Sequence, residues 1–272
     1  MKYNAHMKVK LGKQEMQMLA YLQMRKRQTV KTGELTEPLQ LSRGQERELF
    51  RRMARGGLIA RVRPGFYLVP ERLPLGGSWT PDETLALNTL IGDRNGRYQI
   101  CGPNAFNRYG FDDQIPNRVY AYNNRISGDR TIGAIELTLI KVADGRLGNT
   151  EEMQTAGGQT VKYGSRVRTL VDAVYDWSRF NTLPRGYEWI KGELAAGRVG
   201  AEELVAVALR YGDKGTIRRI GALLEIQGVE EGLLRKLEKA LAPSTGLIPW
   251  IPARPKRGKI NRRWGVVLND RT

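Results

Sequence analysis

The side chains that most often carry out catalysis are scarce in this sequence. It holds one histidine, His6, and one cysteine, Cys101, so Ser-His-Asp and Cys-His arrangements and histidine-rich metal sites cannot be assembled. Without a histidine partner, Cys101 is expected to be a small buried hydrophobic residue. The common glycine-rich nucleotide-binding loops are also missing. The sequence therefore predicts no catalytic residues, no metal and no cofactor.

A metal-dependent nuclease is the alternative enzyme class, because Glu136 and Lys141 share a strand-like run that follows a basic N-terminal segment. Such sites commonly place an acid two residues before a lysine, and no lysine of the sequence has Asp or Glu at that offset. Paired acids such as Asp112-Asp113 fall in predicted loops or helix starts, where they favour solvation and the helix dipole. We expect the protein not to be an enzyme.

Arginine and lysine offer a different chemistry, the binding of polyanions. The net charge is +17 over 272 residues, and it divides into +10 for residues 1–72, +1 for residues 73–248 and +6 for residues 249–272. Basic side chains that neutralise phosphates release condensed counterions, so two basic ends suit a nucleic acid. Charge alone leaves DNA, RNA, an acidic protein and a merely solubilising surface open.

The most regular arginines lie in a predicted helix that starts at Ser42. Residues 42–45 have the form of a capping box, and Gly56 and Gly57 end the helix. One side carries the apolar residues Leu49, Phe50 and Met53. Another carries an arginine at every fourth position, which drifts only about 40° per step around the helix. One face should therefore pack and the other should form a basic ridge.

Flanking elements indicate how this ridge is positioned. A helix is expected over residues 13–27, a short second helix or only a turn over 32–39, and strands over 58–62 and 66–69 with a turn between them. This order predicts a winged helix-turn-helix over residues 1–72, whose third element enters the major groove while the wing meets phosphate. The predicted DNA-binding residues are Arg43, Gln45, Arg47, Arg51, Arg52, Arg55, Arg61 and Arg63. A solvated arginine face on a protein-interaction module is the alternative.

The rest of the chain predicts a second, larger domain. After a linker at 70–78, a helix begins around Thr80, Pro81 and Asp82, with Thr80 as its cap. The expected strands and helices then follow in order: strands 98–101, 118–122, 131–142 and 160–162, a short helix at 103–109, and helices 167–177, 187–196, 201–211, 216–226 and 230–241. The predicted fold class is α+β, with an N-terminal winged helix-turn-helix and a domain over 79–248 that combines a small sheet and a helical bundle.

Residues 249–272 are a basic tail that mixes tryptophan with arginine and lysine. Such a tail could stack on nucleic acid, or its tryptophans could dock on the helical bundle while its charges are solvated. Secondary contacts to nucleic acid or to a partner are predicted for Arg218, Arg219, Arg257, Lys259, Arg262 and Arg263. Arg218 and Arg219 have a structural alternative, because Asp213 and Glu225 are near enough in sequence to neutralise them.

Several segments together resemble the AbiEi-type family, the antitoxin and regulator component of bacterial type IV toxin-antitoxin systems. They are residues 57–67 at the wing, 102–116 after the linker, 165–172 with Arg168 and Asp172, and 218–225. The resemblance implies a repressor that binds its own promoter and counteracts a nucleotidyltransferase-like toxin, directly or indirectly. Asp172 could equally be a satisfied core acid, and regulators of this architecture without a toxin are the alternative.

The sequence also bears on location. Residues 1–10 lack the apolar run of a signal peptide, a single cysteine cannot form an internal disulfide, and charges interrupt every apolar stretch before the roughly 20 residues of a membrane span. We expect a cytoplasmic protein without membrane contact.

Overall fold

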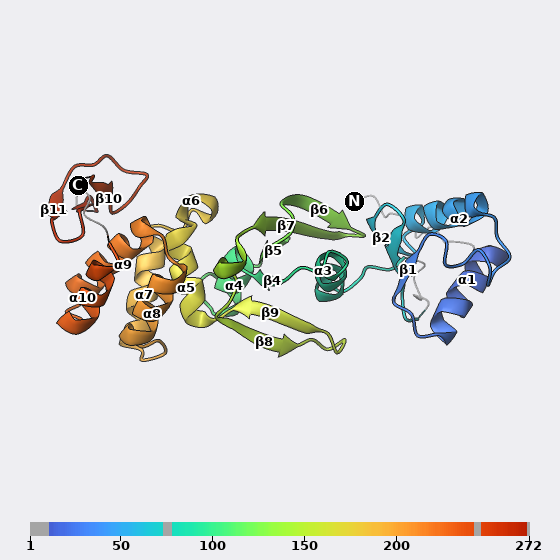
Figure 1. Cartoon of the computed structure of the whole chain (residues 1–272), viewed down its shortest axis with the longest axis horizontal. Coiled ribbons are helices and arrows are strands. Elements are labelled where there is room, and N and C mark those ends of the chain that lie inside the picture. Colours follow the sequence, from blue (N-terminus) through green and yellow to red (C-terminus); the bar gives the residue numbers. More distant parts are fainter. Residues whose placement is uncertain (1–10, 73–77, 242–245, 271–272) are drawn as a thin grey trace, which may run out of the picture.

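The computed structural model describes residues 11–72, 78–241 and 246–270. Its elements follow one another along an elongated molecule (Figure 1). The N-terminal unit lies at one end, a six-stranded sheet lies in the middle, a group of helices follows, and a small C-terminal sheet lies at the opposite end. The fold is mixed α+β, as the sequence predicts.

Residues 11–72 fold into two helices and a small sheet. Helix α1 is Lys13–Met24 and helix α2 is Arg43–Arg55. The strands are β1 (Thr29–Lys31), β2 (Ala60–Arg63) and β3 (Phe66–Leu68), and they form an antiparallel sheet in the order β1-β3-β2. Residues 32–40, where a short helix or a turn was expected, form turns.

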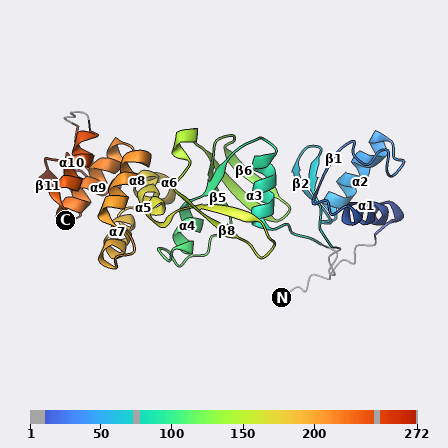
Figure 2. The ribbon, with the colours of Figure 1, turned by 60° about the horizontal axis from the view of Figure 1, so that its bottom comes forward.

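Helix α3 (Glu83–Gly92) lies between this unit and the central sheet (Figures 1 and 2). Asp82 caps it by accepting hydrogen bonds from the backbone N–H groups of Thr84 and Leu85 at 2.9 and 3.1 Å. The prediction of Thr80 as the cap is wrong by two residues, because the short Asp82 carboxylate satisfies these orphan donors directly. The predicted linker falls partly on residues 73–77, which lie outside the described residues.

The central sheet contains six strands in the order β6-β7-β5-β4-β9-β8. They are β4 (Tyr98–Ile100), β5 (Val119–Asn123), β6 (Gly128–Ile132), β7 (Ile135–Lys141), β8 (Thr150–Gln154) and β9 (Thr160–Gly164). The single strand expected over 131–142 is in fact a hairpin of β6 and β7, turned at Gly133 with φ +62°. Strand β8 was not predicted, because all five of its residues are exposed and carry no apolar alternation.

The helices gather beyond the sheet. They are α4 (Gly102–Arg108), α5 (Arg166–Tyr175), α6 (Trp177–Phe180), α7 (Arg185–Ala195), α8 (Ala201–Tyr211), α9 (Lys214–Ile226) and α10 (Glu231–Lys239). A 3₁₀ turn, Asp144–Arg146, precedes β8. Each helix predicted after the linker has its counterpart, and α8 has the predicted bounds.

The predicted tail is a folded element. Strands β10 (Ile248–Pro249), β11 (Lys259–Asn261) and β12 (Val266–Leu268) form a sheet that packs on the helices, so the boundary expected at residue 249 falls inside β10. Trp264 is buried against α9, where a Cβ on Gly221 would come within 2.4 Å of its ring. The tryptophans of the tail are therefore docked on the helices, as one of the two alternatives from the sequence has it.

None of the described helices combines the length and the apolar character that crossing a membrane would require.

Candidate nucleic-acid interface

Helix α2 presents its arginines to solvent as the sequence predicts. The Ser42 side chain accepts from the Gln45 N–H at 3.2 Å, and the Gln45 side chain accepts from the Ser42 N–H at 2.8 Å, which completes the capping box. Arg43, Arg47 and Arg55 are exposed and form no ion pair or hydrogen bond through their side chains with any described residue. The helix therefore carries, on one exposed side, three guanidinium groups that no described residue neutralises.

The other polar candidates of α2 have internal partners. Arg51 pairs with Glu48 at 2.6 Å, and Arg52 donates to Glu15 of α1 at 2.9 Å. The guanidinium of Arg52 helps to hold the pKa of Glu15 below its ordinary value, although burial opposes this shift. Gln45 already uses its amide oxygen in the helix cap. Arg51 and Arg52 remain more than two-fifths exposed, but part of their charge is neutralised within the protein.

Glu46 is a structural residue that the sequence analysis did not single out. It is fully buried, and its two carboxylate oxygens accept from the backbone N–H groups of Gly33 and Leu35 at 2.6 and 2.8 Å. The carboxylate thus fastens the turns of residues 32–40 to α2. Its place on the same helical face as Leu49, Phe50 and Met53 was the clue that it points inward.

The two predicted DNA-binding arginines of the β2–β3 hairpin have different surroundings. Arg61 is exposed and unpaired among the described residues, whereas Arg63 donates to both carboxylate oxygens of Asp93 at 2.5 and 2.9 Å. Lys31 lies 3.6 Å from the same carboxylate. The Arg63 guanidinium holds the pKa of Asp93 below its ordinary value, with Lys31 adding to the effect. Arg63, which the sequence predicts to contact phosphate, therefore pairs with Asp93 at the C-terminal end of α3.

Besides the ion pair of Arg63, apolar residues of the hairpin pack on α3 and the central sheet. Val62 and Phe66 belong to the same buried cluster as Leu87 and Ile91 of α3 and Leu137 of β7. Gly133 allows the close approach, since a Cβ there would lie 3.0 Å from Pro81 and 3.3 Å from Ala60. Figure 2 shows β2 beside α3. One face of the hairpin is therefore used internally, and α2 is left as the open basic surface of residues 11–72.

The segment around Arg168 and Asp172 is a buried ionic cluster. Arg168 is fully buried and donates to Asp172 at 2.9 Å and to the carbonyl oxygens of Gly148 and Arg146. Arg146 donates to the other Asp172 oxygen at 2.7 Å and lies over the Tyr175 ring. The cluster ties α5 to the turn before β8, so Asp172 is the satisfied core acid of the alternative reading.

The six secondary candidates fall into two groups. Arg218 donates to the carbonyl oxygens of Trp264, Gly246 and Gly265, and Arg219 donates to that of Pro249 at 3.3 Å. Burial lowers the pKa of both arginines. Neither arginine forms the ion pair with Asp213 or Glu225 that the structural alternative proposed. Both arginine side chains instead bind carbonyl oxygens of the C-terminal segment.

Arg263 belongs to the same structural group. It pairs with Glu225, Glu231 and Glu238 at 3.4, 2.8 and 2.9 Å, and the Glu231 and Glu238 carboxylates raise its pKa. The second group is exposed, with no side-chain partner among the described residues, and consists of Arg257, Lys259 and Arg262.

Glu136, the acid considered for a nuclease site, is paired with a basic side chain. Glu136 pairs with Arg118 at 2.7 Å, and Arg118 also pairs with Asp129 at 3.1 Å. Across residues 11–72, 78–241 and 246–270, no three acids, cysteines or histidines gather as metal ligands would. Cys101 is buried, and burial raises the pKa of its thiol.

Comparisons with known proteins bear on the fold. No protein-family model matches the chain, and no curated protein matches it. The crystal structure of the RV2827C protein from Mycobacterium tuberculosis is similar, with a TM-score of 0.58 and 14% sequence identity, over 94% of this chain and 92% of that chain. The likeness extends over nearly the full length, so the two chains share their overall fold.

Proposed function

We propose that residues 1–72 act as a winged helix-turn-helix-like unit that binds double-stranded DNA, with the turns of residues 32–40 in place of a second helix, and that the protein is a transcriptional repressor. The observation that carries this proposal is the exposed side of α2, where Arg43, Arg47 and Arg55 have no partner among the described residues. An arginine can donate two hydrogen bonds to the edge of a guanine in the major groove, which is wide enough to admit a helix.

Two features support α2 as the recognition helix rather than a solvated face. Arg52 ties it to α1 and Glu46 ties it to the turns before it, so the helix is held at both sides. A rigid helix that presents free guanidinium groups loses little side-chain and backbone freedom on binding. Arg61 extends the basic surface onto the β2–β3 hairpin, where a phosphate contact would add affinity without choosing sequence.

The antitoxin role is a further proposal that rests on the resemblance to the AbiEi-type family. It adds a cognate nucleotidyltransferase-like toxin whose effect the protein counteracts. A reading frame of that kind immediately downstream, and rescue of cells expressing it by this protein, would support the role. An isolated gene without a toxic neighbour would leave a stand-alone regulator.

The test of DNA recognition is a competition between the protein's own promoter and a scrambled duplex at fixed salt. Arg47→Ala should relax the preference for the promoter, by on the order of 1–3 kcal/mol if Arg47 contacts a base edge. Arg61→Ala should weaken both duplexes equally. Circular dichroism checks that each variant folds. A preference that Arg47→Ala leaves unchanged, or no DNA binding by the folded protein, would overturn the proposal.

A further inference from the structure

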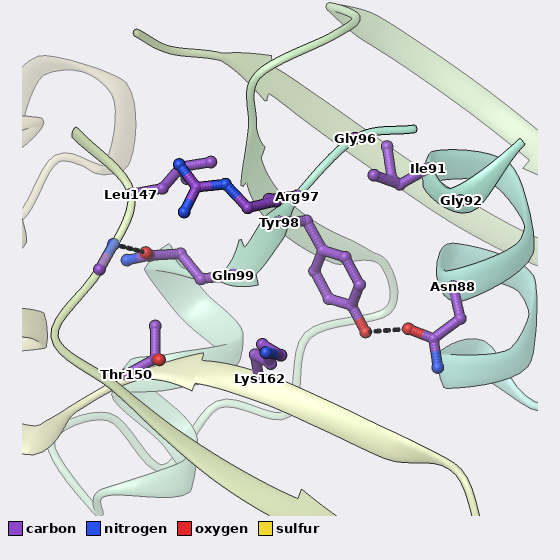
Figure 3. Close-up of a pocket in the computed structure, with 11 residues that line it drawn as sticks. Asn88, Ile91, Gly92, Gly96, Arg97, Tyr98, Gln99, Leu147, Thr150 and Lys162 are labelled. Carbon is purple, nitrogen blue, oxygen red and sulfur yellow. Dashed lines mark hydrogen bonds between the residues drawn. The ribbon is translucent and has the colours of Figure 1, made fainter. Parts of the chain in front are cut away.

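A pocket between α3 and the central sheet is not used by the proposed DNA contact. It has a volume of about 470 Å³, within the range of roughly 300–1,000 Å³ that is usual for small-molecule sites. Ile91 and Gly92 of α3 form one wall, Arg97 and Tyr98 lie at the start of β4, and Leu147 and Lys162 come from the opposite side. Figure 3 shows these side chains around the space.

The chemistry of this lining is selective. Ile91, Leu147 and the Tyr98 ring supply apolar surface, while Arg97 and Lys162 supply two positive charges, and none of the described residues that line the pocket is a carboxylate. Arg97 pairs with Asp144 at 2.8 Å and Lys162 with Glu152 at 2.7 Å, but both pairs are about half exposed or more. Exposed pairs of this kind contribute little and can exchange their partner for a ligand anion.

The neutral polar groups of the pocket are already oriented. Tyr98 donates to the Asn88 side chain at 2.7 Å (Figure 3). Asn88 in turn donates to the Thr160 carbonyl oxygen at 3.1 Å. The side chain of Gln99 is fully buried and accepts from the Gly148 N–H at 2.8 Å, whereas its Nε2 has no partner among the described residues. These hydrogen bonds hold the walls in place before a ligand arrives.

One end of the pocket is also the anchor of the N-terminal unit. Ile91 and Gly92 line the pocket, and the next residue, Asp93, binds Arg63 of the β2–β3 hairpin and Lys31 of β1. A ligand that shifts the last turn of α3 would therefore shift the residue that fixes the hairpin. Pocket and hairpin are joined through three consecutive residues.

We infer that this pocket binds a small organic anion, an apolar or ring-bearing body with one carboxylate or phosphate group, and that binding changes the DNA affinity of residues 1–72. The inference of anion binding does not depend on the proposed function, whereas the inference of regulation rests on the proposed DNA binding. Lys162 and Arg97 attract the anion, and the wall of Ile91, Leu147 and Tyr98 covers its body.

Four small probes test the pocket without DNA, by calorimetry on the full-length protein. Phenyl phosphate and benzoate carry both a ring and an anion, whereas benzyl alcohol lacks the anion and inorganic phosphate lacks the ring. At least one ring-bearing anion should bind, and which of the two binds more tightly distinguishes phosphate from carboxylate. Lys162→Ala should weaken this binding about tenfold, a loss of one charged contact, while Lys141→Ala on β7 should not.

A second variant fills the pocket instead of changing its charge. A Cβ at Gly92 meets no atom within 4 Å, so Gly92→Leu places a side chain in the open space and should abolish binding. Gly192→Leu, at another open helical glycine outside the pocket, is the matched control. Failure of both ring-bearing anions to bind, or equal binding by the Gly92→Leu and Gly192→Leu variants, would overturn the pocket assignment.

Coupling is then measured as the change in promoter affinity at a saturating concentration of the probe that binds. The wild-type protein should show a several-fold change, and Arg63→Ala should keep the probe affinity but lose the change. An unaltered promoter affinity in the wild-type protein overturns the coupling while leaving DNA binding intact. Absence of DNA binding without any probe overturns the proposed function and leaves the calorimetric result standing.

Discussion

Two arginine-rich regions at opposite ends of the molecule differ in what their guanidinium groups do. On α2, Arg43, Arg47 and Arg55 face solvent and lack any partner among the described residues. Around the C-terminal sheet, Arg218 and Arg263 reach carbonyl oxygens and carboxylates that hold the sheet on the helices. The same residue type serves as a free surface charge in one region and as an internal clamp in the other.

This difference shows why a local excess of positive charge does not by itself identify a binding surface. Residues 249–272 carry a net charge of +6, yet their tryptophans are buried and Arg263 is surrounded by three glutamates from α9 and α10. A guanidinium that already donates to carboxylates must give up those bonds before it can bind phosphate. Free arginines on a rigid helix pay no such cost.

The largest effect that separates the two regions is expected for Trp264. Trp264→Ala removes a ring that is 1% exposed and packed on Gly221, which should lower the free energy of unfolding by about 3–5 kcal/mol. Urea unfolding monitored by circular dichroism measures this loss. A change below about 1 kcal/mol would mean that the tail does not dock and that Trp264 is free to stack on nucleic acid.

A smaller but more specific effect is expected for charge removal on the two surfaces. The triple variant Arg43→Ala, Arg47→Ala, Arg55→Ala should reduce promoter affinity roughly 100-fold near 0.1 M salt, and should lower the salt slope by about one per phosphate-contacting arginine lost. Because these side chains have no partner within the described part of the chain, the melting temperature should stay within a few degrees.

The matched control removes three exposed positive charges from the other end, Arg257→Ala, Lys259→Ala and Arg262→Ala. Its promoter affinity should change less than threefold, since a short duplex on α2 lies far from the C-terminal sheet (Figure 1). Equal losses from both triple variants, in fluorescence anisotropy with a short promoter duplex, would show that overall charge and not α2 accounts for binding.

The smallest effect contrasts two neighbours in sequence. Arg263→Met breaks its contacts with Glu225, Glu231 and Glu238 and should destabilise the protein by about 1–2 kcal/mol, less at high salt. Arg262→Met removes an exposed side chain and should change the free energy of unfolding by less than about 0.5 kcal/mol. Thermal unfolding of both variants decides this, and indistinguishable melting temperatures would refute a clamp at Arg263.

Much of the fold was predictable because its signals are local. The Ser42 to Gln45 capping box and the spacing of Leu49, Phe50 and Met53 define α2 from contacts within one helix. The bounds of α8 follow from apolar periodicity in the same way. Strand β8 has no such signal, since its residues alternate between two exposed faces and only pairing with β9 makes them a strand.

The candidate site was predictable only as a set of residues. The recurrence of arginine at every fourth position placed Arg43, Arg47 and Arg55 on one exposed side of a helix, because the helical repeat fixes which residues share a face. It could not show that Arg52 has an acidic partner on α1, or that Glu46 turns inward to bind two backbone N–H groups. Those outcomes depend on where α1 and residues 32–40 lie.

The sequence by itself therefore determined most of the helices, the charge distribution and the exposed basic side of α2, because these depend on composition and on the periodicity of neighbouring residues. Only the tertiary structure decided how Arg52, Arg63 and Arg263 are neutralised, because a guanidinium pairs with whatever lies within about 4 Å, and the partners of these three are far away in the chain. Asp93 is thirty residues from Arg63, and Glu231 is thirty-two from Arg263. Long-range packing therefore gives Arg63 and Arg263 acidic partners and leaves the arginines of α2 exposed.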